Sequence, residues 1–123
     1  MRLHNPVLWF AILSALSVAP GDASDERLRI EVSPRMSIAP AMVRVRAIVP
    51  PDAANRALQI VADSGVYYRS SMVPLDGANA AAITEMTFKN LPGGDYDVTV
   101  VLVDADGRRA ADRRQVTVTS MRP

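Results

Sequence analysis

From residue 28 onward, the chain repeatedly alternates apolar and polar side chains, and this alternation restricts the fold more than any other feature. A period of two puts every second side chain on one face of an extended strand, whereas a helix needs a period of about 3.6. Turn residues separate the alternating runs at intervals of about 8 to 12 residues, as is typical of sandwiches. The runs lie at 28–32, 42–49, 58–63, 66–70, 84–89, 96–103 and 115–119. The sequence therefore predicts an all-β protein, an antiparallel β-sandwich of about seven strands.

The last two runs are joined through a turn that ends in Asp106-Gly107. A two-residue turn would put the valines of the final run on the polar face, because a shift of one residue inverts a whole strand. A three-residue loop at 105–107, with Gly107 in the left-handed conformation, pairs Tyr96 with Val116 and Asp104 with Arg108. We predict the three-residue loop.

The run that begins Leu91-Pro92-Gly93-Gly94-Asp95-Tyr96 and continues into alternating valines resembles the corner before the sixth strand of fibronectin type III and related immunoglobulin-like domains. The resemblance covers residues 91–118 and implies an immunoglobulin-like β-sandwich at the superfamily level. It also implies that Tyr96 puts its ring in the core and bonds its hydroxyl to nearby backbone. The early-strand tryptophan and the disulfide of antibody domains are missing. The expected structural residues of the corner and of the later turn are Leu91, Pro92, Gly93, Tyr96 and Gly107.

Residues 1–23 have the pattern of a secretory signal peptide. A basic start at Arg2 precedes an apolar stretch over 7–19, which is shorter than the roughly 20 residues that a membrane span needs. Small residues at Gly21 and Ala23 predict cleavage after Ala23, with a retained N-terminal helix as the alternative. Residues 24–123 then form one domain, exported to the periplasm or the extracellular space.

The composition excludes several classes of function. Residues 24–123 carry 13 basic and 12 acidic side chains without a basic block, so we expect no nucleic acid and, once the signal is removed, no membrane partner. Cysteine is absent, and the one histidine, His4, lies in the predicted signal peptide. This excludes catalysis by Ser-His-Asp or Cys-His systems and metal sites built on nitrogen and sulfur. We therefore expect no enzyme and no cofactor.

Three further alternatives rest on particular side chains. Oxygen ligands from Asp95, Asp97, Asp104 and Asp106 would suit calcium, although turn chemistry explains the last two equally well. An exposed tyrosine at position 67 or 68 would suit a sugar ring, and carboxylates on facing strands would suit glycoside hydrolysis. We favour none of them, and we do not expect a small-molecule ligand.

The strand order of an immunoglobulin-like domain leads to a hypothesis about binding. The first, second and fifth runs would share one sheet with a charged outer face, on which Arg44 and Arg46 oppose Glu85. The third, sixth and seventh would share the other sheet, whose outer face is far less charged. We expect that face to meet a protein partner or a second copy of the chain. It displays Ala57, Gln59, Val61, Thr99, Val101, Val103, Thr117 and Thr119, with Tyr67 or Tyr68 at its rim. We therefore expect the protein to be an exported interaction or accessory module without catalytic activity. Its candidate interaction surface consists of Val61, Tyr67, Val101 and Val103.

Overall fold

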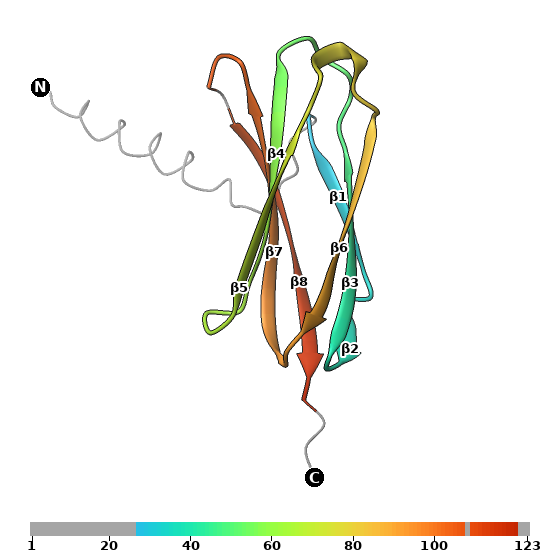
Figure 1. Cartoon of the computed structure of the whole chain (residues 1–123), viewed down its shortest axis with the longest axis vertical. Helices are drawn as coiled ribbons and strands as arrows, with labels where there is room; N and C mark the ends of the chain where they lie inside the picture. The colour runs from blue at the N-terminus through green and yellow to red at the C-terminus, as the bar shows by residue number, and fades with distance from the viewer. Residues whose placement is uncertain (1–26, 108, 121–123) are drawn as a thin grey trace, which may run out of the picture.

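The computed structural model describes residues 27–107 and 109–120, and within them two β-sheets pack face to face (Figure 1). One sheet has three strands in the order β1-β3-β6, and the other has five in the order β2-β8-β7-β4-β5. The strands are β1 (Arg29–Ser33), β2 (Met36–Ile38), β3 (Ala41–Ile48), β4 (Asn55–Asp63), β5 (Tyr68–Pro74), β6 (Ile83–Leu91), β7 (Gly94–Asp104) and β8 (Arg109–Thr119). A short 3-10 helix, Gly77–Asn79, lies between β5 and β6.

The predicted all-β sandwich is confirmed, together with its division into sheets. The first, second and fifth predicted runs became β1, β3 and β6, and the third, sixth and seventh became β4, β7 and β8. The predicted signal segment, residues 1–23, lies outside the described residues and stays a prediction. Among the described residues, no helix has the length and apolar character needed to cross a membrane.

The sequence prediction missed β2. Met36–Ile38 pairs in parallel with β8 and adds a strand to the edge of the five-stranded sheet. Its three residues are all exposed or half-buried, so no alternation marks them. The prolines on either side, Pro34 and Pro40, made the segment read as a connection; both follow cis peptide bonds.

The pairing of β7 with β8 has the register expected for a three-residue loop. Tyr96 lies opposite Val116 and Val103 lies opposite Arg109. Gly107 has a φ of 83°, and its N–H donates to the Asp104 carbonyl at 3.0 Å. That left-handed conformation favours glycine because a Cβ would be strained there. Residue 108, the expected partner of Asp104, lies outside the described residues.

The core follows directly from this register. The even-numbered side chains of β7 from Tyr96 to Leu102 are almost completely buried, as are Leu58 and Ile60 of β4. On the facing sheet, Val43 and Val45 of β3 and Phe88 of β6 close the interior. Burying a side chain of this size stabilises a fold by about 1.5–3 kcal/mol. The described domain is thus stabilised by its buried apolar side chains and not by disulfides, because the chain has no cysteine.

Two carboxylates are buried among the described residues, Asp104 and Asp112, and Asp112 links the two sheets. Asp112 of β8 is almost completely buried, and its Oδ2 accepts a hydrogen bond from the Ile30 N–H of β1 at 3.0 Å. Its Oδ1 accepts from the Arg114 guanidinium at 2.7 Å and from the Arg113 N–H at 2.9 Å. Asp112 therefore joins the edge of the three-stranded sheet to the five-stranded sheet.

Replacing Asp112 with alanine should destabilise the domain strongly, because the change leaves the Ile30 N–H unsatisfied and removes the carboxylate that pairs with Arg114. We expect the free energy of unfolding to fall by about 2–4 kcal/mol. Urea denaturation followed by circular dichroism measures this loss. Asp97→Ala, a change at a half-exposed position of β7, is the control and should cost less than about 1 kcal/mol. Equal losses for the two variants would show that Asp112 does not join the sheets.

Candidate functional site

The outer face of the five-stranded sheet carries a strip of uncharged side chains that crosses β5, β4 and β7. Cross-strand pairing brings together Met72, Gln59 and Val101 in one row. The neighbouring rows are Pro74, Ala57 and Val103 on one side and Ser70, Val61 and Thr99 on the other. These nine residues, six of them apolar and none of them charged, are named the apolar strip below. In β8, Ala111 continues the central row beside Val101.

The residues of the apolar strip on β4 and β7 are half-buried, because side chains on neighbouring strands cover one another on a flat sheet. At the sheet edge Met72 is 59% exposed. Val61, Val101 and Val103, three of the four residues predicted as an interaction surface, therefore lie together on one face.

Tyr67, the fourth predicted residue of that surface, points the other way. Its ring packs against the core and meets the Tyr96 ring edge to face, with 6.5 Å between the ring centroids. Tyr68 is the tyrosine on the outer face, where it lies opposite Asp63 and is 57% exposed. Neighbouring residues of a strand face opposite sides, and the turn at Ser64 decides which tyrosine faces outward. There the Ser64 N–H donates to the Tyr67 carbonyl at 3.0 Å.

The outer face of the three-stranded sheet is charged, in contrast to the apolar strip. Arg46 forms ion pairs with Glu31 at 3.3 Å and with Glu85 at 3.2 Å, and it lies between them in the sheet. Exposed pairs of this kind contribute little stability, but they keep a surface well solvated. Met42 and Ile83 are the large apolar side chains that are exposed on this face.

The corner before β7 is built around Tyr96. The Leu91 side chain is buried, and the Tyr96 hydroxyl donates to the Pro92 carbonyl at 2.6 Å. Gly93 packs against Ser120: a Cβ at this glycine would overlap the Ser120 Oγ and lie 3.1 Å from its N. Burial raises the pKa of the Tyr96 hydroxyl, the nearby Tyr67 adds to the rise, and a hydrogen bond with Ser64 lowers it in part.

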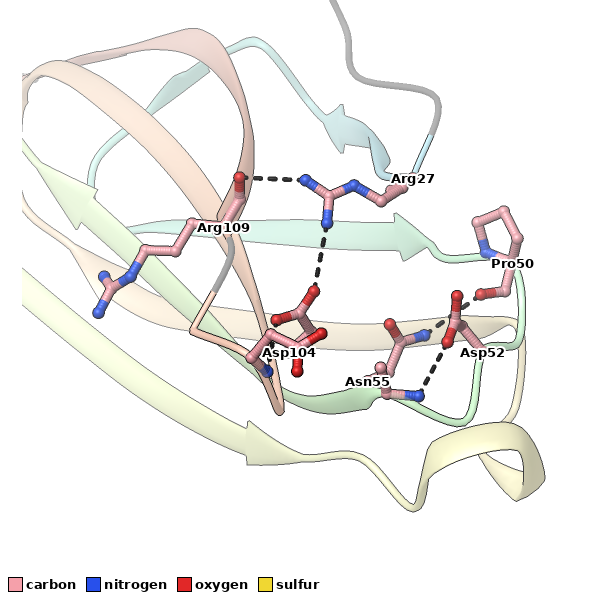
Figure 2. Close-up of polar contacts among 8 residues, drawn as sticks. Arg27, Pro50, Asp52, Asn55, Asp104 and Arg109 are labelled. Carbon is pink, nitrogen blue, oxygen red and sulfur yellow. Dashed lines mark hydrogen bonds and ion pairs between the residues drawn. The ribbon is translucent and has the colours of Figure 1, made fainter.

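A second polar region lies at the opposite end of β7, and of its residues the sequence analysis considered only Asp104 and Asp106 (Figure 2). Arg27 bridges the Asp104 carboxylate at 3.5 Å and the Arg109 carbonyl at 3.2 Å, and Figure 2 shows its guanidinium between them. Asp104 also accepts from the Asp106 N–H at 3.0 Å. Asn55 is buried beside them and donates to the Pro50 carbonyl at 3.2 Å. These contacts brace the turn between β7 and β8, the loop before β4 and the segment before β1.

The aspartates considered for calcium do not come together. Asp95 and Asp97 lie at the start of β7, whereas Asp104 and Asp106 lie at or beyond its end. The rise of a strand separates Asp97 from Asp104 by about 23 Å. Among the described residues, no three histidine, cysteine, aspartate or glutamate side chains are grouped so that they could hold a metal ion.

Comparison with known proteins gives likenesses of structure only. No protein-family model matches the sequence, and no curated protein matches it. Superoxide reductase (neelaredoxin) from Ignicoccus hospitalis is similar with a TM-score of 0.62 and 17% identity, over 78% of this chain and 83% of that one. A family 76 glycoside hydrolase from a bovine Bacteroides thetaiotaomicron strain has a TM-score of 0.52 and 16% identity, over 74% of this chain and 20% of that one. The PmoD soluble domain from Methylocystis sp. has a TM-score of 0.50 and 10% identity, over 74% and 90%.

These likenesses show an all-β fold and no particular family, so membership of the immunoglobulin-like superfamily stays a prediction. They also correct the prediction of a module without catalytic activity that is not an enzyme. That prediction took sandwiches of this kind to be binding or spacer domains, but the similar structures include superoxide reductases, which are enzymes. At 17% identity the likeness shows the fold alone, so it assigns no activity to this chain.

The described residues do not fit the chemistry that the name superoxide reductase implies. Reduction of superoxide transfers electrons, and such reactions use a redox metal or another redox cofactor held by the protein. The chain has no cysteine, and its one histidine, His4, lies outside the described residues. Because the described part of the chain also lacks a cluster of metal-binding side chains, we derive no superoxide chemistry for it.

Replacing Tyr96 with phenylalanine tests the corner through its pH dependence. At pH 7 the loss of the hydrogen bond to Pro92 should lower the free energy of unfolding by about 1–2 kcal/mol. Because the pKa of Tyr96 is raised in the folded protein, its contribution is complete below the unfolded pKa and is lost as pH rises through the folded value. Urea denaturation between pH 7 and about pH 11 measures the effect, since an unperturbed tyrosine titrates near 10. The difference between wild type and Tyr96→Phe should shrink above pH 10, and a constant difference would contradict this account.

Proposed function

We propose that this domain binds a polypeptide partner through the apolar strip on the outer face of its five-stranded sheet. The observation that supports the proposal is the contrast between the two outer faces. Three successive rows across β5, β4 and β7 contain no charged side chain, whereas the opposite face carries a network of arginine and glutamate. Depletion of charge at the centre of a surface patch is the compositional signal of a protein interface.

Charges around the apolar strip define the kind of partner that fits it. Asp63 and Asp97 lie opposite each other beyond one end of the strip, with Asp95 farther along β7. Arg109 and Arg113 border it along β8. A complementary partner would present apolar side chains to the strip, a basic group to the aspartates and an acidic group to the arginines. Such complementarity sets orientation and association rate more than affinity.

The setting of this interaction is part of the same proposal. The segment at residues 1–23 supports export, so the partner would meet the domain in the periplasm or the extracellular space. The corner at Leu91, Pro92 and Tyr96 supports a relation to fibronectin type III-like domains within the immunoglobulin-like superfamily. Neither point depends on whether the apolar strip is the binding surface.

Changing Val101 and Val103 together to lysine should abolish partner binding, because two ammonium groups would be buried against the partner's apolar surface. Photo-cross-linking from position 61 in cells of the source organism, followed by mass spectrometry, identifies the partner and measures the yield of adduct. We expect at least about a tenfold loss of adduct, the effect of removing one interface hot spot. Gln59→Lys changes a polar residue at the centre of the strip and should give the same loss without touching the core.

Met42→Lys is the matched control, because it puts a lysine at an exposed apolar position on the other sheet. It should leave the adducts unchanged. Thermal melting monitored by circular dichroism checks that each variant is folded. Unchanged adducts in folded Val101→Lys/Val103→Lys and in Gln59→Lys would overturn the proposal.

A further inference from the structure

Within the described part of the chain, the edge strand β5 has a row of backbone N–H and C=O groups that no other strand pairs with. Among the described strands, β5 pairs with β4 alone, and it forms one margin of the five-stranded sheet (Figure 1). Its seven residues, Tyr68–Pro74, pair with β4 without a bulge. An exposed, regular edge of this kind is a template for pairing with another chain.

Other sheet edges in the described part of the chain are short, occupied or interrupted. β2 has only three residues. On β1, the outward Ile30 N–H is already bound by Asp112 at 3.0 Å. On β6, Asn90 has a φ of 60°, which breaks the regular extended backbone. Natural sheets protect their edges in these ways, and β5 has such protection only at its end, where Pro74 lacks an N–H.

Two backbone hydrogen bonds next to β5 fix which of its N–H and C=O groups face outward. The Leu75 N–H donates to the Arg56 carbonyl at 2.8 Å, and the Tyr67 carbonyl accepts from the Ser64 N–H at 3.0 Å. Because backbone groups alternate along an antiparallel strand, the odd-numbered residues of β5 face β4. The N–H and C=O groups of Tyr68, Ser70 and Met72 therefore point away from the sheet.

We infer that β5 pairs with β5 of a second copy of this chain, antiparallel and about a two-fold axis at Ser70. In this register Ser70 faces Ser70 of the other copy, and each Tyr68 faces a Met72. Each of the three outward N–H groups of one strand then donates to a carbonyl of the other copy, and each of the three outward carbonyls accepts from an N–H of the other copy. Pro74, which has no donor, falls outside the paired segment.

Side chains are compatible with the same register. Tyr68 and Met72 are both exposed on the outer face, where an aromatic ring opposite a thioether is a favourable cross-strand pair. The one charged residue of β5, Arg69, would face Ser71 and not its own copy. Its guanidinium is turned inward, where it donates to the Lys89 carbonyl at 3.2 Å and lies over the Phe88 ring at 5.9 Å. No like charges therefore oppose each other across the axis.

The pairing would join two five-stranded sheets into one continuous sheet, with the apolar strips of both copies on the same face. A partner with two binding segments could then bind both copies at once, which raises avidity without new contacts. The inference uses the edge of β5 and stands apart from the proposed function, which uses the face.

A cysteine at position 70 tests the register directly, because the full chain has no other cysteine. Directly opposed residues of a hydrogen-bonded antiparallel pair have Cα atoms about 5.5 Å apart, within the range that a disulfide spans. Met72→Cys is the matched control, because the two-fold axis puts its copies about 13 Å apart or more. With oxidised glutathione, Ser70→Cys should form a covalent dimer at least about tenfold faster than Met72→Cys.

Sedimentation equilibrium of the unmodified chain, from micromolar to millimolar concentration, should show a reversible monomer–dimer equilibrium. Ser70→Pro removes the central donor at a position whose N–H is unpaired in the monomer, as proline already does at residue 74, and it should abolish the dimer. Thr119→Pro, an exposed position at the end of β8, should not. A monomer at all concentrations, a dimer that persists in Ser70→Pro, or equal rates for the two cysteine variants would overturn the inference. Val101→Lys/Val103→Lys should leave this dimer intact, so failure here and failure of the proposed function are distinguishable.

Discussion

The register between β7 and β8 is the constraint on which the rest of the structure depends. β7 lies between β8 and β4, and both neighbours take their pairing from it. With Tyr96 opposite Val116, the even-numbered residues of β7 face the interior and the odd-numbered residues face solvent. A slip of one residue would bury Asp95, Asp97 and Thr99 and would expose Tyr96, Val98, Val100 and Leu102, at a cost of several kcal/mol. The left-handed Gly107 therefore determines both what forms the core and what forms the apolar strip.

Buried polar side chains hold the sandwich closed where strands of different sheets approach each other. Asp112 binds a backbone N–H of β1, and Asp104 and Asn55 brace the loops at one end. The Tyr96 hydroxyl does the same for the corner at the other end. Each of these groups has a partner in the fold, as buried polar groups must if they are not to destabilise it. In a domain without cysteine, such contacts fix how the two sheets meet.

The sequence was informative about the fold and about one surface, and less so about function. Alternation identified the main strands, and the resemblance to immunoglobulin-like domains implied how they divide between the two sheets. The turn at Gly107 gave the register that put Val101 and Val103 on the outer face. The sequence left open whether Tyr67 or Tyr68 lies on that face. Neighbouring residues of a strand face opposite sides, and the turn at Ser64 determines which of the two faces outward. β2 carries no alternation. The register of the three-residue loop puts Asp112 opposite Val100 on the inner side of β8, but only the packing of β1 shows which N–H it binds. The inference that a β-sandwich of this kind has no catalytic activity was wrong, because some proteins with a similar fold are enzymes.

The sequence by itself determined the class of fold, the sheet to which each main strand belongs and the residues that face solvent on β7. The class of fold and the solvent-facing residues of β7 follow from a period of two and from short turns, which are local in the chain. The assignment of strands to sheets was implied by the resemblance to immunoglobulin-like domains. Tertiary structure decided what depends on distant contacts. It brought Asp112 to Ile30, 82 residues away in sequence, turned Tyr67 against Tyr96, and left β5 as the regular open edge. Such contacts depend on how the two sheets pack, and no local pattern in the chain encodes that packing.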